Sequence, residues 1–273
     1  MRNGSGYKGR RLTGVRWVVL AAAVLPFAAL PAAAHHVAEV AAQIYKRDMF
    51  FEPVDRAAPG FLLETVDGRK VALSDFSGKV VVLDFIYARC KEECPLQSDL
   101  LARVQQQINR TPMRSFVKFV SVATDTEDAK ETAPIIRSYG ALHGFDAANW
   151  VFLYRGSGPP DAGIKAAAAY GLKFEVEKDG DQMHGVHAHV IDQSGHLRAR
   201  FHGLKFDPTD LILFVNALTN EPPGAASEEI DPASVSLRAG LSEVPPLWFE
   251  ILLAALGAGL TGSALLLIRA LRR

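Results

Sequence analysis

Apolar residues recur with two different periods along this chain, and the change of period marks the predicted elements. Residues 80–86 are apolar except for Asp84, so they predict a strand buried on both faces. From Leu96 to Val104 the apolar positions follow a helical spacing, and Pro95 suits the first turn of that helix. Further strands are predicted at 116–123, 150–154, 186–191 and 197–201, further helices at 127–139, 162–169 and 208–218, and a hairpin at 61–65 and 70–73. Strands that alternate with helices, followed by a late hairpin, predict an α/β sandwich.

Both ends of the chain carry a hydrophobic segment with basic residues beside it. In residues 1–34, five basic residues precede an apolar run and the small residues Ala32-Ala33-Ala34, which is typical of a cleaved signal peptide. An uncleaved anchor helix is the alternative, although Pro26 interrupts the run. Residues 247–268 are apolar except for Glu250 and are followed by three arginines, so they predict a transmembrane helix. The two segments together predict a bacterial inner-membrane protein whose domain lies on the periplasmic side.

The remaining chain divides by composition. Residues 35–58 are expected to be a lead-in that is helical at 37–47, and residues 59–219 to be the folded domain. Residues 220–246 are rich in Pro, Ala, Ser and Glu and are expected to be a linker, and residues 269–273 a cytoplasmic basic tail. Thirty basic residues balance thirty acidic ones, so the net charge favours no nucleic-acid partner.

The chain has two cysteines, Cys90 and Cys94, in one Cys-x-x-x-Cys segment. Thiols in an oxidising compartment are rarely left unpaired without a role, so the pair indicates redox or metal chemistry. A structural disulfide is the alternative, but closing so short a loop would restrict the unfolded chain little. A cysteine at this strand-to-helix junction is expected to have a lowered pKa, because free backbone N–H groups stabilise the thiolate. Two thiolates suit Cu(I) and are too few for a closed zinc site.

The segment Asp84-Phe85-Ile86-Tyr87-Ala88-Arg89-Cys90, with Cys94-Pro95, resembles the Sco/SenC copper proteins. In that family a Cys-x-x-x-Cys-Pro motif follows a strand of a thioredoxin fold, and the resemblance covers about residues 59–218. The chain differs in having Lys91-Glu92-Glu93 where the family has proline after the first cysteine, and Ser121-Val122-Ala123 lacks the usual Asp-Pro. The resemblance implies a thioredoxin-like α/β fold in which Cys90 and Cys94 are redox-active thiols and copper ligands.

The resemblance also implies a third copper ligand, a histidine in a loop before the late hairpin, eleven residues ahead of the turn glycine. Counting back from Gly195 reaches His184, with His187 and Met183 as alternatives. His187 and His189 are two apart on a predicted strand, so they share a face that could belong to a second metal site or to a polar surface. Two thiolates and one imidazole form a trigonal site for Cu(I), which could hold Cu(II) with an added ligand.

The function that the resemblance implies is a copper chaperone for cytochrome c oxidase. It would deliver copper to the dinuclear copper centre during assembly, or reduce the cysteines of that centre. Its partners would be the copper-bearing oxidase subunit and another copper chaperone or thiol reductase. The alternative is a thiol–disulfide oxidoreductase that carries no metal. Dedicated oxidoreductases of this fold use two intervening residues and need no distant imidazole, so the sequence favours a binding protein over an enzyme. The Pro-x-x-x-Thr-x-x-Cys approach of a peroxiredoxin does not occur before Cys90.

Overall fold

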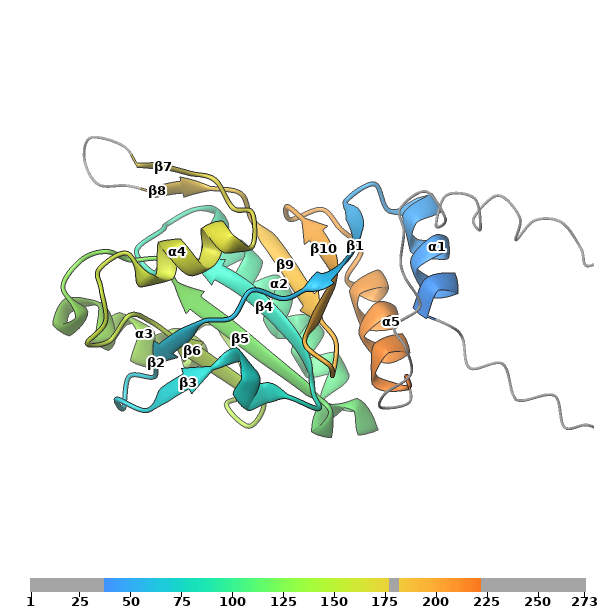
Figure 1. The fold of residues 1–273 in the computed structure, drawn as a ribbon, viewed down its shortest axis with the longest axis horizontal. Coiled ribbons are helices and arrows are strands. Elements are labelled where there is room, and N and C mark those ends of the chain that lie inside the picture. The colour runs from blue at the N-terminus through green and yellow to red at the C-terminus, as the bar shows by residue number, and fades with distance from the viewer. Residues whose placement is uncertain (1–36, 177–181, 222–273) are drawn as a thin grey trace, which may run out of the picture. The chain divides into compact units, whose positions relative to one another are not determined.

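The computed structural model of this 273-residue chain describes residues 37–176 and 182–221 (Figure 1). The predicted signal peptide, the transmembrane segment and nearly all of the linker lie outside these residues and stay predictions. None of the helices in the described ranges combines the length and the hydrophobicity needed to cross a bilayer.

Within the described residues, six strands form a central mixed sheet in the order β1-β10-β9-β4-β5-β6. Strands β4, β5 and β6 are parallel, whereas β9, β10 and β1 add to β4 in antiparallel fashion. These strands are β1 (Phe51–Ala57), β4 (Val80–Ile86), β5 (Val117–Ala123), β6 (Trp150–Leu153), β9 (His187–Ile191) and β10 (His196–His202). Strand β4, the strand that precedes the cysteines, therefore lies in the middle of the sheet.

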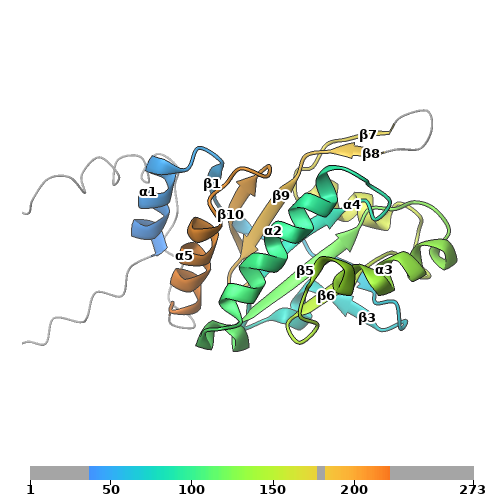
Figure 2. The ribbon, with the colours of Figure 1, turned by 180° about the vertical axis from the view of Figure 1, so that it is seen from behind.

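Helices cover both faces of this sheet. The α-helices of the described residues are α1 (Val37–Arg47), α2 (Glu93–Ile108), α3 (Ala129–His143), α4 (Ala162–Ala169) and α5 (Pro208–Thr219), and two short 3₁₀ helices span Leu73–Phe76 and Pro112–Ser115. Figure 2 shows α2 and α3 in front of one face of the sheet, while α4 lies in front of the other face in Figure 1. The mixed sheet with helices on both faces confirms the predicted α/β class.

The alternation of side chains along β4 explains why both faces are apolar. Val80 and Val82 contribute to the core beneath α2 and α5, whereas Val81, Leu83 and Phe85 contribute to the core beneath α4. All seven residues of β4 are buried. Because successive side chains of a strand point to opposite faces, a strand between two helical layers must be apolar throughout.

The lead-in before residue 59 supplies a helix and a strand. The helix predicted at 37–47 is confirmed as α1, which contacts α5 and forms an ion pair between Arg47 and Asp210. Strand β1, which was not predicted from the sequence, pairs with β10 at the edge of the sheet. Its polar residues and Pro53 are tolerated there because an edge strand has one unpaired side.

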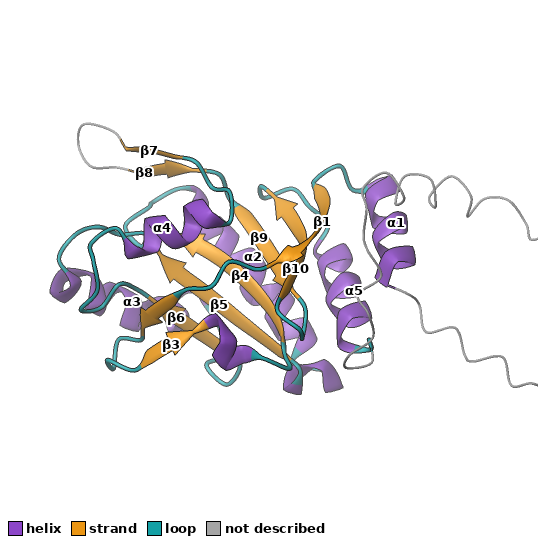
Figure 3. Cartoon of the chain, viewed as in Figure 1, coloured by secondary structure: helices purple, strands orange, loops and turns teal. Residues whose placement is uncertain are grey.

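Two hairpins lie outside the central sheet (Figure 3). The predicted one is confirmed as β2 (Leu62–Glu64) and β3 (Lys70–Ala72), where Gly68 takes a φ of 79° in the turn. The other consists of β7 (Phe174–Val176) and β8 (Gln182–His184), and periodicity did not predict it. Three-residue strands are too short to give a reliable alternation of apolar and polar residues, and β2 and β3 were predicted through the turn dipeptide Asp67-Gly68 between them.

Candidate functional site

The two cysteines lie where the central strand β4 passes into α2. Cys90 is half-buried in the connecting loop, and its backbone N–H donates to the carbonyl of Tyr87 at 3.0 Å. Cys94 is in the first turn of α2 and only 4% exposed. Both thiols are free, and they belong to one apolar cluster at this end of the sheet. Two soft sulfur donors are therefore adjacent, one shielded by the core and one reachable from outside.

The pKa of Cys94 is raised, although this residue lies in the first turn of α2. Burial is the largest cause, and the neighbouring Cys90 adds to it through charge and a hydrogen bond. A backbone hydrogen bond at Tyr87 opposes the rise. The helix start does offer N–H groups, but desolvation of the buried thiolate outweighs them. Burial therefore disfavours the thiolate form of Cys94.

Asp84 places a carboxyl group in the core on the cysteine side of the sheet. Its Oδ1 accepts from the Ser121 hydroxyl at 2.8 Å, and the indole of Trp150 donates to the same hydroxyl at 3.1 Å. Oδ2 has no hydrogen-bond partner among the described residues. Burial raises the pKa of Asp84 to about 7, and the Ser121 hydrogen bond offsets part of this rise. A polar residue in the middle of an apolar strand was visible in the sequence, but its role was not.

Replacing Asp84 with Asn should make the free energy of unfolding less dependent on pH. The folded-state pKa lies above the ordinary 3.8, so the protonated carboxyl stabilises the fold at low pH, and this stability is lost as the pH rises through about 7. A difference of three pKa units corresponds to roughly 4 kcal/mol at the alkaline limit. The stability of Asp84→Asn relative to the parent should therefore increase from about pH 5 to pH 8 in urea unfolding.

Asp161→Asn is the matched control, because the Asp161 side chain is 47% exposed and pairs with Lys165 at the surface. Its effect on unfolding should be small at every pH. A stability difference for Asp84→Asn that stays constant with pH would show that the buried carboxyl does not titrate between the two states.

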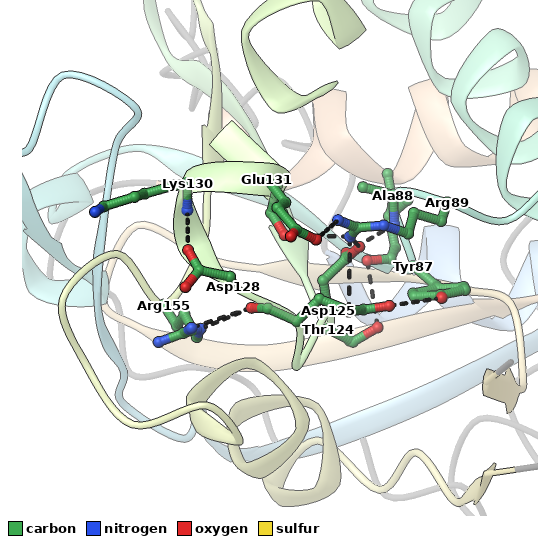
Figure 4. Close-up of polar contacts among 12 residues, drawn as sticks. Tyr87, Ala88, Arg89, Thr124, Asp125, Asp128, Lys130, Glu131 and Arg155 are labelled. Atoms are coloured by element: carbon green, nitrogen blue, oxygen red, sulfur yellow. Dashed lines mark hydrogen bonds and ion pairs between the residues drawn. The ribbon is translucent and has the colours of Figure 1, made fainter. Parts of the chain in front are cut away.

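Polar contacts fix the loop before Cys90 to the segment that follows β5 (Figure 4). The Tyr87 hydroxyl donates to Glu127 at 2.8 Å, and the Ala88 N–H donates to Asp125 Oδ2 at 2.8 Å. Arg89 donates to Asp125 Oδ1 at 2.7 Å. Burial raises the pKa of Asp125, while Ala88 and Arg89 act in the opposite direction. Each of the three residues before Cys90 is thereby bonded to one neighbouring segment.

His184 is the last residue of β8, so the predicted loop is a strand at this position. Its backbone pairs with Phe174 in β7. The next residue, Gly185, lines a cavity of about 530 Å³ together with Glu93, the residue before Cys94. The amide of Gln97 in α2 also donates to the carbonyl of His187 at 2.9 Å. The segment that follows His184 therefore lies against the first turns of the cysteine helix.

The histidines His187, His189 and His202 form a cluster, and His187 also lines the cavity that Gly185 shares with Glu93. The rings of His187 and His189 stack with centroids 5.9 Å apart, as expected for residues on one face of a strand. His202 contacts His187 at 4.6 Å between centroids and bonds to Glu52 at 2.7 Å. Burial and the neighbouring His187 lower the pKa of His189, which keeps this ring neutral in the core. No group of three or more His, Cys, Asp or Glu side chains among the described residues is arranged to hold a metal ion.

The comparisons with known proteins agree on one family. The family model SCO1/SenC matches residues 52–219. A SCO1 protein homolog of Bacillus subtilis (strain 168) is 22% identical over 165 residues, which cover 59% of this chain and 82% of the relative. BsSco, described as a member of the Sco family of cytochrome c oxidase assembly proteins with a disulfide switch, aligns with a TM-score of 0.53 and 21% identity over 62% of this chain and 96% of its own. The copper-bound ScoI of Arabidopsis thaliana aligns with a TM-score of 0.51 and 19% identity over 61% of this chain and 100% of its own. The structural likenesses confirm the predicted Sco-type α/β fold.

Proposed function

The chain belongs to the SCO1/SenC family, and on this premise we propose that it binds copper through Cys90, Cys94 and His184. We further propose that it serves the assembly of cytochrome c oxidase, by delivering copper to the dinuclear centre or by reducing the cysteines of that centre. The copper-bound state of one Sco relative and the assembly role named for another support this assignment.

The observation that carries the proposal is the pair of adjacent free thiols at the end of β4. Cu(I) is a soft ion that prefers thiolates, and a metal ion can take the place of the proton that burial retains on Cys94. Gly185 and Glu93, each next in sequence to a proposed ligand, line one cavity, which supports a third ligand from this segment. His187 lines the same cavity and is the alternative to His184. A site with few protein ligands leaves room for the thiolate of a recipient, so copper can be transferred by ligand exchange.

The test is copper analysis of the full-length protein, purified in detergent, reduced, and loaded with Cu(I). One tightly bound copper per chain is expected, together with protection of both cysteines from alkylation. Copper that is removed by a weak chelator, with alkylation rates equal to those of the metal-free protein, would exclude a copper-carrying role.

A thiol–disulfide oxidoreductase is the second candidate, favoured by the unequal burial of the two thiols. The Cys90 thiolate would attack a target disulfide, forming a mixed disulfide and releasing one target thiol. The Cys94 thiolate would then attack the mixed disulfide, forming the Cys90–Cys94 bond and releasing the second target thiol. Two electrons pass from the pair to the target, and the protein must then be reduced again by a thiol reductase. Turnover with a model disulfide substrate in the absence of copper would favour this candidate.

For the location of the protein, we propose a bacterial inner-membrane anchor at residues 247–268 with the domain on the periplasmic side. The signal-like N-terminal sequence and the arginines of residues 269–273 support this topology. Protease added outside sealed spheroplasts should digest the domain. Digestion only after the membrane has been opened would contradict this topology.

A further inference from the structure

Asp125 joins the backbone and the side chain of the residues before Cys90. One carboxylate oxygen accepts the N–H of Ala88 and the other accepts the guanidinium of Arg89. We propose that Arg89 and Asp125 form a clamp that positions Cys90 against Cys94, so that the clamp sets the copper affinity of the pair and its tendency to form a disulfide. The copper part of this inference rests on the proposed function, and the disulfide part does not.

The sheet brings the two halves of the clamp together. Strands β4 and β5 are parallel neighbours, with Ile86 opposite Ala123, so the loops that leave their carboxyl ends meet at one edge. Arg89 comes from the first loop, and Asp125 from the second. Thr132 of α3 holds the same guanidinium nitrogen through a hydrogen bond of 3.1 Å. Figure 4 shows Arg89 pointing into this group of carboxylates. The guanidinium is thus fixed from both a loop and a helix.

Burial makes this contact more than a surface ion pair. The Asp125 side chain is 1% exposed and that of Arg89 is 24% exposed. A buried pair of this kind adds little net stability compared with apolar contacts, but removing Arg89 would leave the buried Asp125 carboxylate without its cationic partner. Removing Asp125 would leave Arg89 paired only with the more exposed Glu127 and Glu131. Arg89 is next to Cys90 in the sequence, and Asp125 bonds both its guanidinium and the backbone N–H of Ala88, so loss of these contacts would free the backbone that carries the thiol. The clamp is therefore expected to act on the position of the sulfur atom.

Position matters for both reactions of the thiol pair. Groups that hold a metal ligand in place typically change metal affinity by about tenfold to hundredfold when they are replaced. The equilibrium with glutathione also depends on position, since one glutathione disulfide accepts two electrons and two protons from the two cysteine thiols and leaves as two glutathione thiols. Thiols held side by side have a high effective concentration for this reaction. A loosened clamp should therefore lower both the Cu(I) affinity and the tendency of the two thiols to form a disulfide.

The test compares the full-length parent with Asp125→Asn, Arg89→Gln, the double variant and Arg89→Lys. Asn keeps an oxygen for the Ala88 N–H but offers Arg89 no charge. Lys keeps the charge but lacks the planar guanidinium, whose one nitrogen bonds Asp125 and Thr132 while the other faces Glu131. Asp128→Ala is the matched control, because Asp128 caps α3 through the N–H of Lys130 in the same segment without touching the cysteine loop. Cu(I) affinity, the glutathione equilibrium and urea unfolding are measured for each protein.

Each single clamp variant should bind Cu(I) about tenfold more weakly or worse, and should form the disulfide less readily. The double variant should bind Cu(I) only slightly more weakly than the weaker-binding single variant, because each single substitution already removes the same interaction. Asp128→Ala should be slightly less stable because α3 loses its cap, while the Cu(I) affinity and the glutathione equilibrium stay at parental values.

The two proposals can fail separately. Parental Cu(I) affinity and a parental glutathione equilibrium in folded Arg89→Lys and Arg89→Gln would overturn the clamp. If the parent itself binds no copper, the proposed function fails, and the glutathione equilibrium alone decides. A changed glutathione equilibrium in the clamp variants, but not in Asp128→Ala, then supports the clamp. An unchanged glutathione equilibrium in the clamp variants overturns it. If Asp125→Asn does not fold, Arg89→Lys, which keeps the charge beside Asp125, supplies the same comparison.

Discussion

Replacing either cysteine with serine should abolish stoichiometric Cu(I) binding, with a loss of affinity greater than about a hundredfold. Removing a ligand itself should cost more than the tenfold to hundredfold found for groups that only support a ligand. A serine hydroxyl has the size of the thiol but is a hard donor that stays protonated, so it cannot replace a thiolate for Cu(I). Chelator competition with Cys90→Ser, Cys94→Ser and the parent measures the loss.

The same two variants also report on the different surroundings of the thiols. The thiolate is the species that is alkylated, and burial both shields Cys94 and raises its pKa. Cys94 in the Cys90→Ser variant should therefore react more slowly with iodoacetamide than Cys90 in the Cys94→Ser variant. Equal copper affinity in one serine variant and the parent would remove that cysteine from the proposed site.

Replacing His184 with Ala should weaken Cu(I) binding at least about tenfold while leaving the thiol–disulfide equilibrium of Cys90 and Cys94 near the parental value. An imidazole contributes to the metal sphere but takes no part in sulfur exchange, so the two properties should separate at this residue. Copper affinity is measured by competition with a Cu(I) chelator, and the thiol equilibrium against glutathione.

Two further histidines make this experiment discriminating. His187→Ala tests the alternative ligand, whose ring lies against His189 and His202 and which lines the cavity shared by Gly185 and Glu93. His196→Ala is the matched control, because its imidazole is 40% exposed and lies at hydrogen-bond distance from Ser194 at the late turn. Loss of copper in His187→Ala but not in His184→Ala would show that counting back from Gly195 selects the wrong histidine. Parental affinity in both variants would contradict a three-ligand site.

The sequence by itself determined the elements whose patterns are local. A strand buried on both faces is nearly all apolar, and residues 80–86 meet this condition except at Asp84, so β4 was predicted with its observed bounds. Helix α4 and the turn at Gly68 were likewise evident from the order of residues. The Cys-x-x-x-Cys-Pro motif was found in the same way, because ligand spacing within one strand-to-helix junction is a property of neighbouring residues.

Only the tertiary structure decided what depends on contacts between distant segments. Strand β1 pairs with β10 about 145 residues later in the chain, and no local pattern of residues predicts this pairing. The raised pKa of Cys94 follows from burial by elements on several sides, which outweighs the local effect of the helix start. The contact of Arg89 with Asp125 required the knowledge that β4 and β5 are parallel neighbours. Local spacing therefore identified the chemical groups, whereas the sheet determined which of them meet and in what electrostatic surroundings.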